Sequence, residues 1–145
     1  MGARYKVNFH GDSLEYVLKT NVHIRNAFDL KRVVQCQAIW DTGAVYSAIT
    51  AQCAKELGLT PLETVKAVSA SGQFDARLYL IRIEIEGLGL SIVAEALECE
   101  LLHEAKEVGL LIGMNVISKG DLMISNLDGR TSLSFRIPPD ERIEF

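Results

Sequence analysis

The chain has 145 residues, 48% of them hydrophobic and 23% charged, and its net charge is −4. These values suit one folded domain and argue against disorder. A mildly acidic chain without a basic block lacks the positive surface that attracts nucleic acid and anionic membranes, so neither is expected as a partner. The longest apolar stretch, residues 108–117, is about half the ~20 residues of a membrane-spanning helix, and no signal peptide is expected.

The cysteines and histidines give no sign of a disulfide framework or a metal site. Cys36, Cys53 and Cys99 are an odd number and lack CxxC spacing, and the histidines are scattered along the chain. Unpaired thiols are typical of a reducing compartment, so a cytoplasmic location is expected. No metal and no cofactor are expected.

A period of two in the first part of the chain predicts strands. Apolar and polar residues alternate from Tyr5 to Phe9, Gly11-Asp12 interrupts them, and the alternation resumes from Leu14 to Leu18. This pattern predicts an extra N-terminal hairpin over about residues 4–20. Residues 33–40 are apolar on both sides and rich in β-forming types, which is typical of a central strand.

Two short helices are predicted among the strands. Thr50 is a suitable N-cap for a helix over residues 51–57, and Gly58 is a suitable stop. A second short helix is predicted to follow Gly113, over residues 114–118.

The later strands are marked by alternation and by turn residues. Apolar side chains alternate with polar ones over residues 79–85, and a further strand is predicted over residues 90–97. Asp128-Gly129 separates residues 122–126 from residues 130–137, which is a strong hairpin signal. Many short strands with one or two small helices predict an all-β fold, a closed or folded-over barrel.

The chain shows no internal repeat, low-complexity tract or linker. We therefore predict a single domain over residues 1–145. Its core spans about residues 30–137, and residues 138–145 form a C-terminal tail.

An acidic residue directly follows the predicted central strand. The strand ends at Trp40 and runs into Asp41, Thr42 and Gly43. A carboxylate at the end of a buried strand is costly unless it is hydrogen-bonded or functional, and the glycine lets another backbone come close. Because Asp-Thr-Gly is also a common turn tripeptide, it is a weak signal on its own.

A second feature makes the first more specific. Later in the chain another apolar strand, residues 109–112, runs into a glycine and a short helix. The residues of this motif are Leu111, Ile112, Gly113 and Asn115. The two features in this order are more informative than either one alone.

With both features in place, the sequence resembles the retropepsin family of retroviral-type aspartic proteases over roughly residues 33–137. WDTGAVYSAIT, residues 40–50, resembles the family's catalytic Asp-Thr-Gly-Ala loop. LLIGMNVI, residues 110–117, resembles its paired-hydrophobic-glycine motif, and TSLSF, residues 131–135, resembles its closing strand. The resemblance implies a retropepsin-like barrel with one lobe per chain.

The resemblance also implies the residues of the site. Residues 64–85 occupy the place of the family's flap, a mobile hairpin that covers the bound peptide. The implied catalytic residues are Asp41, Thr42 and Gly43, and the implied substrate-binding residues are Gly43, Ala44, Ala70, Ser71 and Gly72.

The implied chemistry needs two carboxyl groups that share one proton. The chain contains one Asp-Thr-Gly, and 145 residues are too few for two such lobes. The resemblance therefore implies a homodimer that brings two Asp41 side chains to its axis. The expected function is that of an aspartic endopeptidase acting on peptides or proteins.

Two positions depart from the retroviral pattern. Retroviral enzymes usually carry an acidic residue after the alanine of the loop and an arginine after the later glycine, and these two form an ion pair. Here the positions hold Val45 and Met114. We expect an apolar contact in place of the ion pair, an exchange that is often neutral for stability, while the mode of dimer assembly stays open.

Two other functions also stay open. A retropepsin-like dimer could be a catalytically silent dimerisation or peptide-binding module, because a fold does not guarantee an activity. An unrelated β-barrel that binds a ligand would use Asp-Thr-Gly as a turn, but it leaves the Gly113 motif unexplained. The intact Asp41, Thr42 and Gly43 favour catalysis, since a pure binding module has no use for a costly acid.

Overall fold

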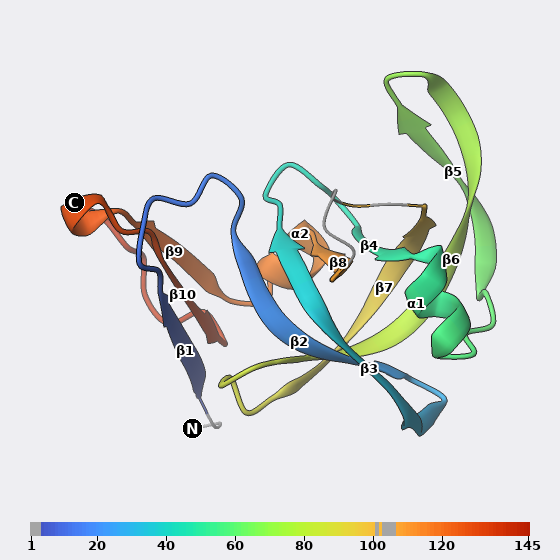
Figure 1. The fold of residues 1–145 in the computed structure, drawn as a ribbon, viewed down its shortest axis with the longest axis horizontal. Helices are drawn as coiled ribbons and strands as arrows, with labels where there is room; N and C mark the ends of the chain where they lie inside the picture. Colours follow the sequence, from blue (N-terminus) through green and yellow to red (C-terminus); the bar gives the residue numbers. More distant parts are fainter. Residues whose placement is uncertain (1–3, 101, 103–106) are drawn as a thin grey trace.

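The computed structural model describes residues 4–100, 102 and 107–145 and shows a mostly β fold (Figure 1). Two short helices, α1 (Ala51–Glu56) and α2 (Met114–Ile117), accompany the strands. The strands are β1 (Tyr5–His10), β2 (Lys19–Asn26), β3 (Asp29–Trp40), β4 (Ser47–Thr50), β5 (Glu63–Ser69), β6 (Gly72–Ile85), β7 (Ser91–Cys99), β8 (Val108–Ile112), β9 (Asp121–Ser125) and β10 (Ser132–Ile137). The all-β prediction is confirmed.

Seven of these strands form one sheet that closes on itself. Its order is β2-β3-β8-β4-β7-β6-β5, and β2 also pairs with β6. This last pairing joins the two sides of the sheet into a barrel, with β5 attached outside the ring as the partner of β6. Most neighbours are antiparallel, but β3 runs parallel to β8, and β4 runs parallel to β7. The predicted folded-over barrel is confirmed.

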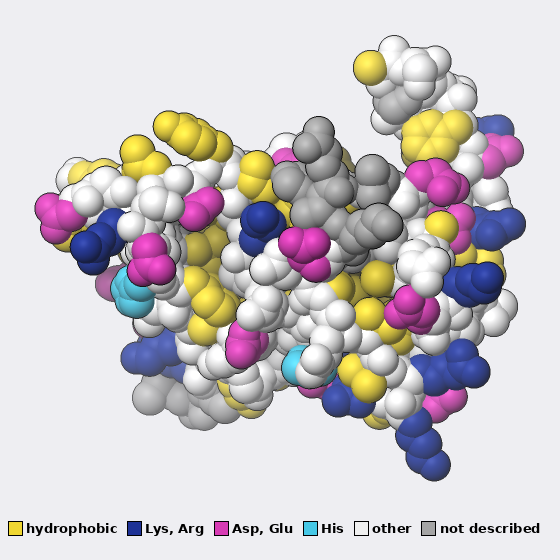
Figure 2. Space-filling model, in the orientation of Figure 1, with side chains coloured by type: hydrophobic (Ala, Val, Ile, Leu, Met, Phe, Trp, Pro, Cys, Tyr) yellow, Lys and Arg dark blue, Asp and Glu magenta, His cyan; other side chains and the backbone are white. Residues whose placement is uncertain are grey.

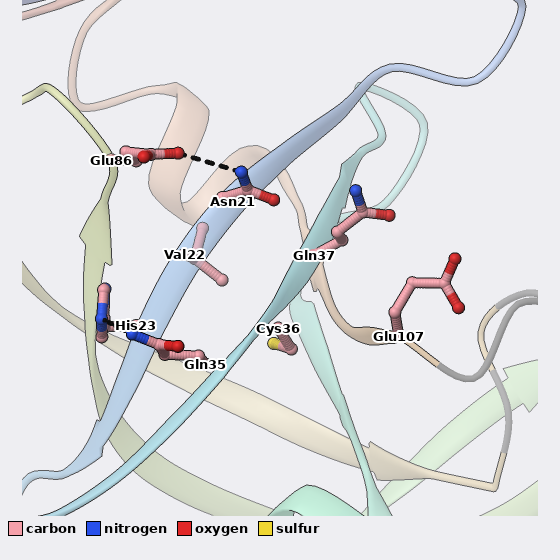
Figure 3. A pocket seen from close by; sticks show the side chains of 8 residues that line it. All are labelled: Asn21, Val22, His23, Gln35, Cys36, Gln37, Glu86 and Glu107. Atoms are coloured by element: carbon pink, nitrogen blue, oxygen red, sulfur yellow. Dashed lines mark hydrogen bonds between the residues drawn. The ribbon is translucent and has the colours of Figure 1, made fainter.

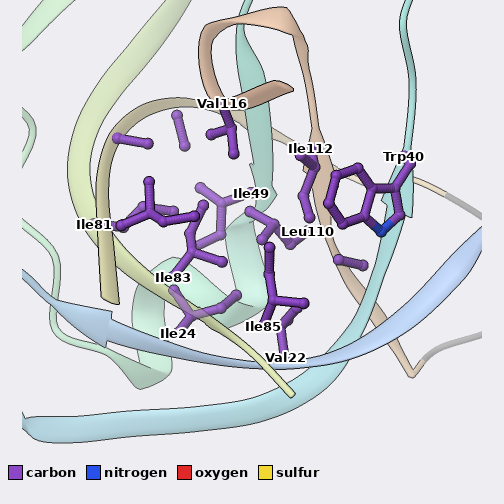
Figure 4. Close-up of a cluster of buried hydrophobic side chains, with 14 of the residues drawn as sticks. Val22, Ile24, Trp40, Ile49, Ile81, Ile83, Ile85, Leu110, Ile112 and Val116 are labelled. Atoms are coloured by element: carbon purple, nitrogen blue, oxygen red, sulfur yellow. The ribbon is translucent and has the colours of Figure 1, made fainter. Parts of the chain in front are cut away.

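The barrel is filled by the apolar side chains of the alternating strands (Figure 4). Ile24, Ile81, Ile83 and Leu110 are fully buried. Burying side chains of this size stabilises the fold by ~1.5–3 kcal/mol each. Trp40 also belongs to the core: its indole N–H donates to Thr20 Oγ1, so the ring packs inside the fold and its polar atom is satisfied.

The remaining three strands form a second sheet, and here one prediction is wrong. The sheet order is β1-β10-β9, so β1 pairs with β10 near the other end of the chain. Residues 11–18 form no strand, and no hairpin forms over residues 4–20. Gly11 N–H instead donates to the backbone oxygen of Thr131, the residue just before β10, and this bond ties the segment to the start of that strand. Alternation identified β1 as a strand but carries no information about its partner.

The two sheets are joined through an aromatic contact. Trp40 at the end of β3 meets Phe135 of β10 edge to face, with the ring centroids 5.1 Å apart and an angle of 61° between the planes. Both side chains are buried. Such a pair contributes ~0.5–1.5 kcal/mol beyond the area it buries, and here it fixes the small sheet against the end of the barrel that carries Asp41.

The short helices and the turns follow their local signals. Thr50 caps α1 by accepting the Cys53 N–H, and Gly58, with φ of 62°, follows its C-terminal end. Asp128 and Gly129 both adopt positive φ between β9 and β10, as the hairpin signal predicts. No strand follows Ile137, and no helix within the described residues is long and apolar enough to cross a membrane.

Candidate active site

Asp41 lies where β3 leaves the sheet. The parallel pairing of β3 with β8 sets Trp40 opposite Ile112, and the Asp41 N–H then donates to Ile112 O over 2.9 Å. The end of β8 therefore holds the Asp41 backbone. Because parallel strands end at the same edge of a sheet, the two motifs seen in the sequence leave the barrel side by side.

The Asp41 carboxylate is engaged on one side only. Its Oδ1 accepts the Gly43 N–H over 2.8 Å, and its backbone carbonyl accepts the Ala44 N–H. Within the described chain, no hydrogen bond reaches Oδ2. Asp41 is half-buried, while Thr42 and Gly43 are exposed. The loop thus holds the carboxylate in a fixed orientation and leaves one oxygen available.

The start of α2 is bound directly to the Asp41 loop. Met114 N–H donates to Ala44 O, and Asn115 N–H donates to Val45 O, over 2.7 and 3.0 Å. The approach is so close that a Cβ on Gly113 would lie 2.4 Å from Tyr46 O. Only glycine fits there, which explains why the second motif contains one.

A buried serine that the sequence analysis did not single out completes this connection. Ser47 Oγ accepts the Gly113 N–H over 3.0 Å and donates to Asn115 Oδ1 over 2.8 Å. The same amide oxygen accepts the Ser47 N–H, and Asn115 Nδ2 donates to Glu95 O. The available signal was a lone hydroxyl at the start of an apolar strand, which is too common to identify a partner.

The predicted flap is a long β hairpin. β5 and β6 pair from Glu63 opposite Leu78 to Ser69 opposite Gly72, and Ala70 and Ser71 form the turn. The hairpin stands out from the body, and the described side chains at its very tip carry no charge (Figure 2). The tip and the loop after β3 project toward the same side of the molecule (Figure 1).

Three large apolar side chains are exposed beside Asp41. Val45 is 74% exposed, Tyr46 43% and Met114 37%. Val45 and Met114 are the two positions that depart from the retroviral pattern. Both lie on the segments that hydrogen-bond to each other, so they belong to one surface. We refer to Val45, Tyr46 and Met114 as the loop patch.

The structure also contains a polar pocket away from Asp41. It has a volume of about 460 Å³ and lies along β2 and β3 (Figure 3). Its polar side chains largely satisfy one another: Asn21 donates to Glu86, and His23 bonds to Gln35. Within the described residues, no group of three or more His, Cys, Asp or Glu side chains could hold a metal ion.

Comparisons with known proteins agree with this geometry. Residues 31–119 match a family model described as "gag-polyprotein putative aspartyl protease". A search of curated proteins gives no significant match.

Solved structures show a similar fold. The crystal structure of a retropepsin-like aspartic protease from Rickettsia conorii has a TM-score of 0.56 and 15% identity, covering 93% of this chain and 96% of that one. EIAV protease in complex with the inhibitor HBY-793 has a TM-score of 0.51 and 18% identity, covering 72% and 88%. At these identities the likeness concerns the fold.

Proposed function

Because the chain belongs to the retropepsin-like family of aspartic proteases, we propose that it is an aspartic endopeptidase that works as a homodimer. The observation that carries the proposal is the Asp41 loop. Its carboxylate is oriented by the Gly43 N–H, while Oδ2 has no hydrogen bond within the described chain. An oriented carboxylate with an open oxygen is suited to accept a proton from water.

The proposed reaction uses the Asp41 carboxyl groups of two subunits. One is ionised and takes a proton from a water molecule between them. The other is protonated and donates to the carbonyl oxygen of the scissile peptide bond, so that the developing negative charge is stabilised. Neither step forms a covalent bond to the protein. The pair acts as a unit, and one chain offers only half of it.

The loop patch supports the dimeric arrangement. Apolar side chains exposed beside a site are commonly covered by a partner, and a two-fold axis through the loops would bring two copies of this patch together. Thr42 is exposed and lies next to Asp41, so its hydroxyl can bond across the axis.

The hairpin formed by β5 and β6 supports an extended peptide as the substrate. A peptide that lies between the Asp41 loop and the hairpin tip can form backbone hydrogen bonds with Gly43, Ala44 and the tip residues Ala70, Ser71 and Gly72. Backbone recognition of this kind selects an extended chain and leaves side-chain preference to the pocket walls.

Replacing Asp41 by asparagine tests the proposal. The Asp41→Asn side chain has nearly the same shape and can still accept the Gly43 N–H, so the variant should fold and associate normally. Its activity on peptide substrates should be lost, because an amide does not accept the proton of water. Circular dichroism and sedimentation provide the controls for fold and association.

Mixed dimers test whether the site is shared. When equal amounts of wild type and Asp41→Asn exchange subunits freely, about a quarter of the dimers carry two carboxylates. Activity per wild-type chain should then fall to about half. If wild-type chains keep full activity after verified exchange, the site is not shared. If the wild-type protein associates but cleaves no member of a diverse peptide library, the chain is a silent binding module.

A further inference from the structure

Two thiols meet beside the core of the barrel, away from the Asp41 loop: Cys53 belongs to the buried core cluster, and Cys36 packs against it. Cys36 lies on β3 and Cys53 on α1, and both point at the backbone of Gly109 on β8. A Cβ on Gly109 would lie 2.5 Å from Cys53 Sγ and 3.0 Å from Cys36 Sγ. The two sulfur atoms therefore share the space that a side chain at position 109 would fill, and both cysteines are free.

The thiols can be reached from outside. Both line a pocket of about 500 Å³ between β3, α1 and the start of β8. Cys36 is half-buried and Cys53 is 7% exposed, so both sulfurs are approached through this pocket and not from the open surface. Three carboxylates, Glu56, Glu100 and Glu107, line the pocket, and no Lys or Arg is among its described lining residues. This charge favours small neutral reagents over anions.

The surroundings of the two thiols shift their pKa values in opposite directions. The hydrogen bond from Cys36, followed by one from Thr50, lowers the pKa of Cys53 to about 7, although burial opposes the shift. The hydrogen bond with Cys53, together with burial, raises the pKa of Cys36. These opposite shifts favour Cys53 as the sulfur that ionises and Cys36 as the thiol that reacts second.

We propose that Cys36 and Cys53 form a redox site that a neutral hydroperoxide oxidises to an intramolecular disulfide. In the first step the Cys53 thiolate attacks the peroxide, an S–O bond forms and the O–O bond breaks, and the leaving alkoxide or hydroxide takes up a proton. In the second step Cys36 attacks the Cys53 sulfenic acid, the S–S bond forms, and the S–O bond breaks with release of water. Two electrons pass from the two sulfurs to the peroxide.

The third cysteine provides a matched control. Cys99 donates its thiol to Ile49 O over 3.4 Å, and burial together with Glu98 and Glu100 raises its pKa to about 11. It therefore stays protonated at neutral pH and should react slowly. Cys99→Ser should oxidise as the wild type does.

Peptide mapping tests the proposal. The reduced full-length protein is treated with hydrogen peroxide, alkylated and cut with trypsin. Cys36 and Cys53 share the tryptic peptide of residues 33–55, whereas Cys99 lies in another. The first peptide should lose two hydrogen atoms, resist alkylation and regain both thiols with dithiothreitol. After cleavage at Trp40 or Tyr46, its two fragments should stay linked. A bridge to Cys99, or added oxygen without a bridge, would overturn the proposal.

Single variants and a second oxidant test the order of events. Cys36→Ser should leave a Cys53 sulfenic acid that dimedone labels, whereas Cys53→Ser should show no label on Cys36. Labelling of Cys36 instead would reverse the assigned roles. Oxidised glutathione, which is anionic, should react at least tenfold more slowly than hydrogen peroxide at equal concentration. Equal rates would contradict the preference for a neutral oxidant.

A thermal measurement checks the structural effect without relying on activity. The disulfide would close a ring of residues 36–53, which contains the whole Asp41 loop. Closing a ring of this size reduces the freedom of the unfolded chain, so Tm should rise by roughly 5 °C or more on oxidation. Cys36→Ser treated in the same way should show no rise. A fall in Tm of the bridged protein would mean that the native positions of β3 and α1 do not accommodate the bond.

Discussion

At the scale of single residues, the candidate site depends on a few buried polar atoms. The Asp41 loop and the start of α2 approach so closely that their backbone groups form hydrogen bonds with each other and with the side chain of Ser47. Ser47 is fully buried and bonds both to Gly113 and to Asn115. A buried hydroxyl with two partners is costly to remove, because the groups left behind lose their hydrogen bonds without gaining water.

Ser47→Ala should therefore destabilise the protein by ~1–3 kcal/mol, since the Gly113 N–H loses its acceptor. Urea denaturation measures the change in the free energy of unfolding. Ser134→Ala is a suitable control, because Ser134 Oγ donates to Asn8 at an exposed position, and its loss should cost less than ~1 kcal/mol. Equal losses in the two variants would show that the Ser47 network contributes little.

At the scale of elements, the strands in the body of the barrel have neighbouring strands on both sides, whereas the outer part of the β5–β6 hairpin does not. The inner part of β6 pairs with β7 on one side and with β2 on the other, as at Ile81 and Ile83, and these side chains are buried. Toward the tip, β5 and β6 pair only with each other, and residues 70–75 are exposed. The tip is therefore the less stable part of the same strand.

Hydrogen exchange should reveal this difference. In the free protein the amides of residues 68–75 should exchange much faster than those of residues 81–85, because opening the tip exposes almost no apolar surface. A peptide-like inhibitor bound at Asp41 should slow exchange at the tip. Equal protection of the two segments in the free protein would contradict the assignment of the tip as a mobile flap.

Elements with local signals were predictable from the sequence, and pairings between distant segments were not. The α1 helix follows from Thr50 and Gly58, and the turn at Asp128-Gly129 follows from the conformations those residues favour. The partner of β1 does not follow from any local pattern. Alternation shows which face of a strand is buried, but it does not show which strand forms backbone hydrogen bonds along its edge. Among the residues of the candidate site, Asp41 and Gly113 were identified from the family resemblance. Ser47 was identified only from its hydrogen bonds in the folded chain.

At the scale of the whole molecule, the proposed function requires two chains. The loop patch is apolar and is exposed in the single chain. A dimer held by this patch loses affinity when a charge enters it, because the charge would be buried without a partner.

Val45→Asp should weaken association at least tenfold in sedimentation equilibrium, and peptide cleavage should fall with the dimer population. The fold should persist, since Val45 is exposed in the single chain. Phe28→Asp is the matched control: Phe28 is also 74% exposed but lies in the turn between β2 and β3. An unchanged dimer affinity in Val45→Asp would place the interface elsewhere.

The pairing of β1 with β10 also sets an order of events during synthesis. Tyr5 lies opposite Ile137, so β1 must wait while the ribosome adds the 132 residues that follow Tyr5 up to Ile137 (137 − 5 = 132) before its partner strand exists. At ~5–20 residues per second this wait lasts on the order of ten seconds. The strands of the barrel can pair within that time, whereas β1 keeps an open edge that is available to neighbouring nascent chains. The small sheet is thus the last part to form, and crowded translation should affect it before the barrel.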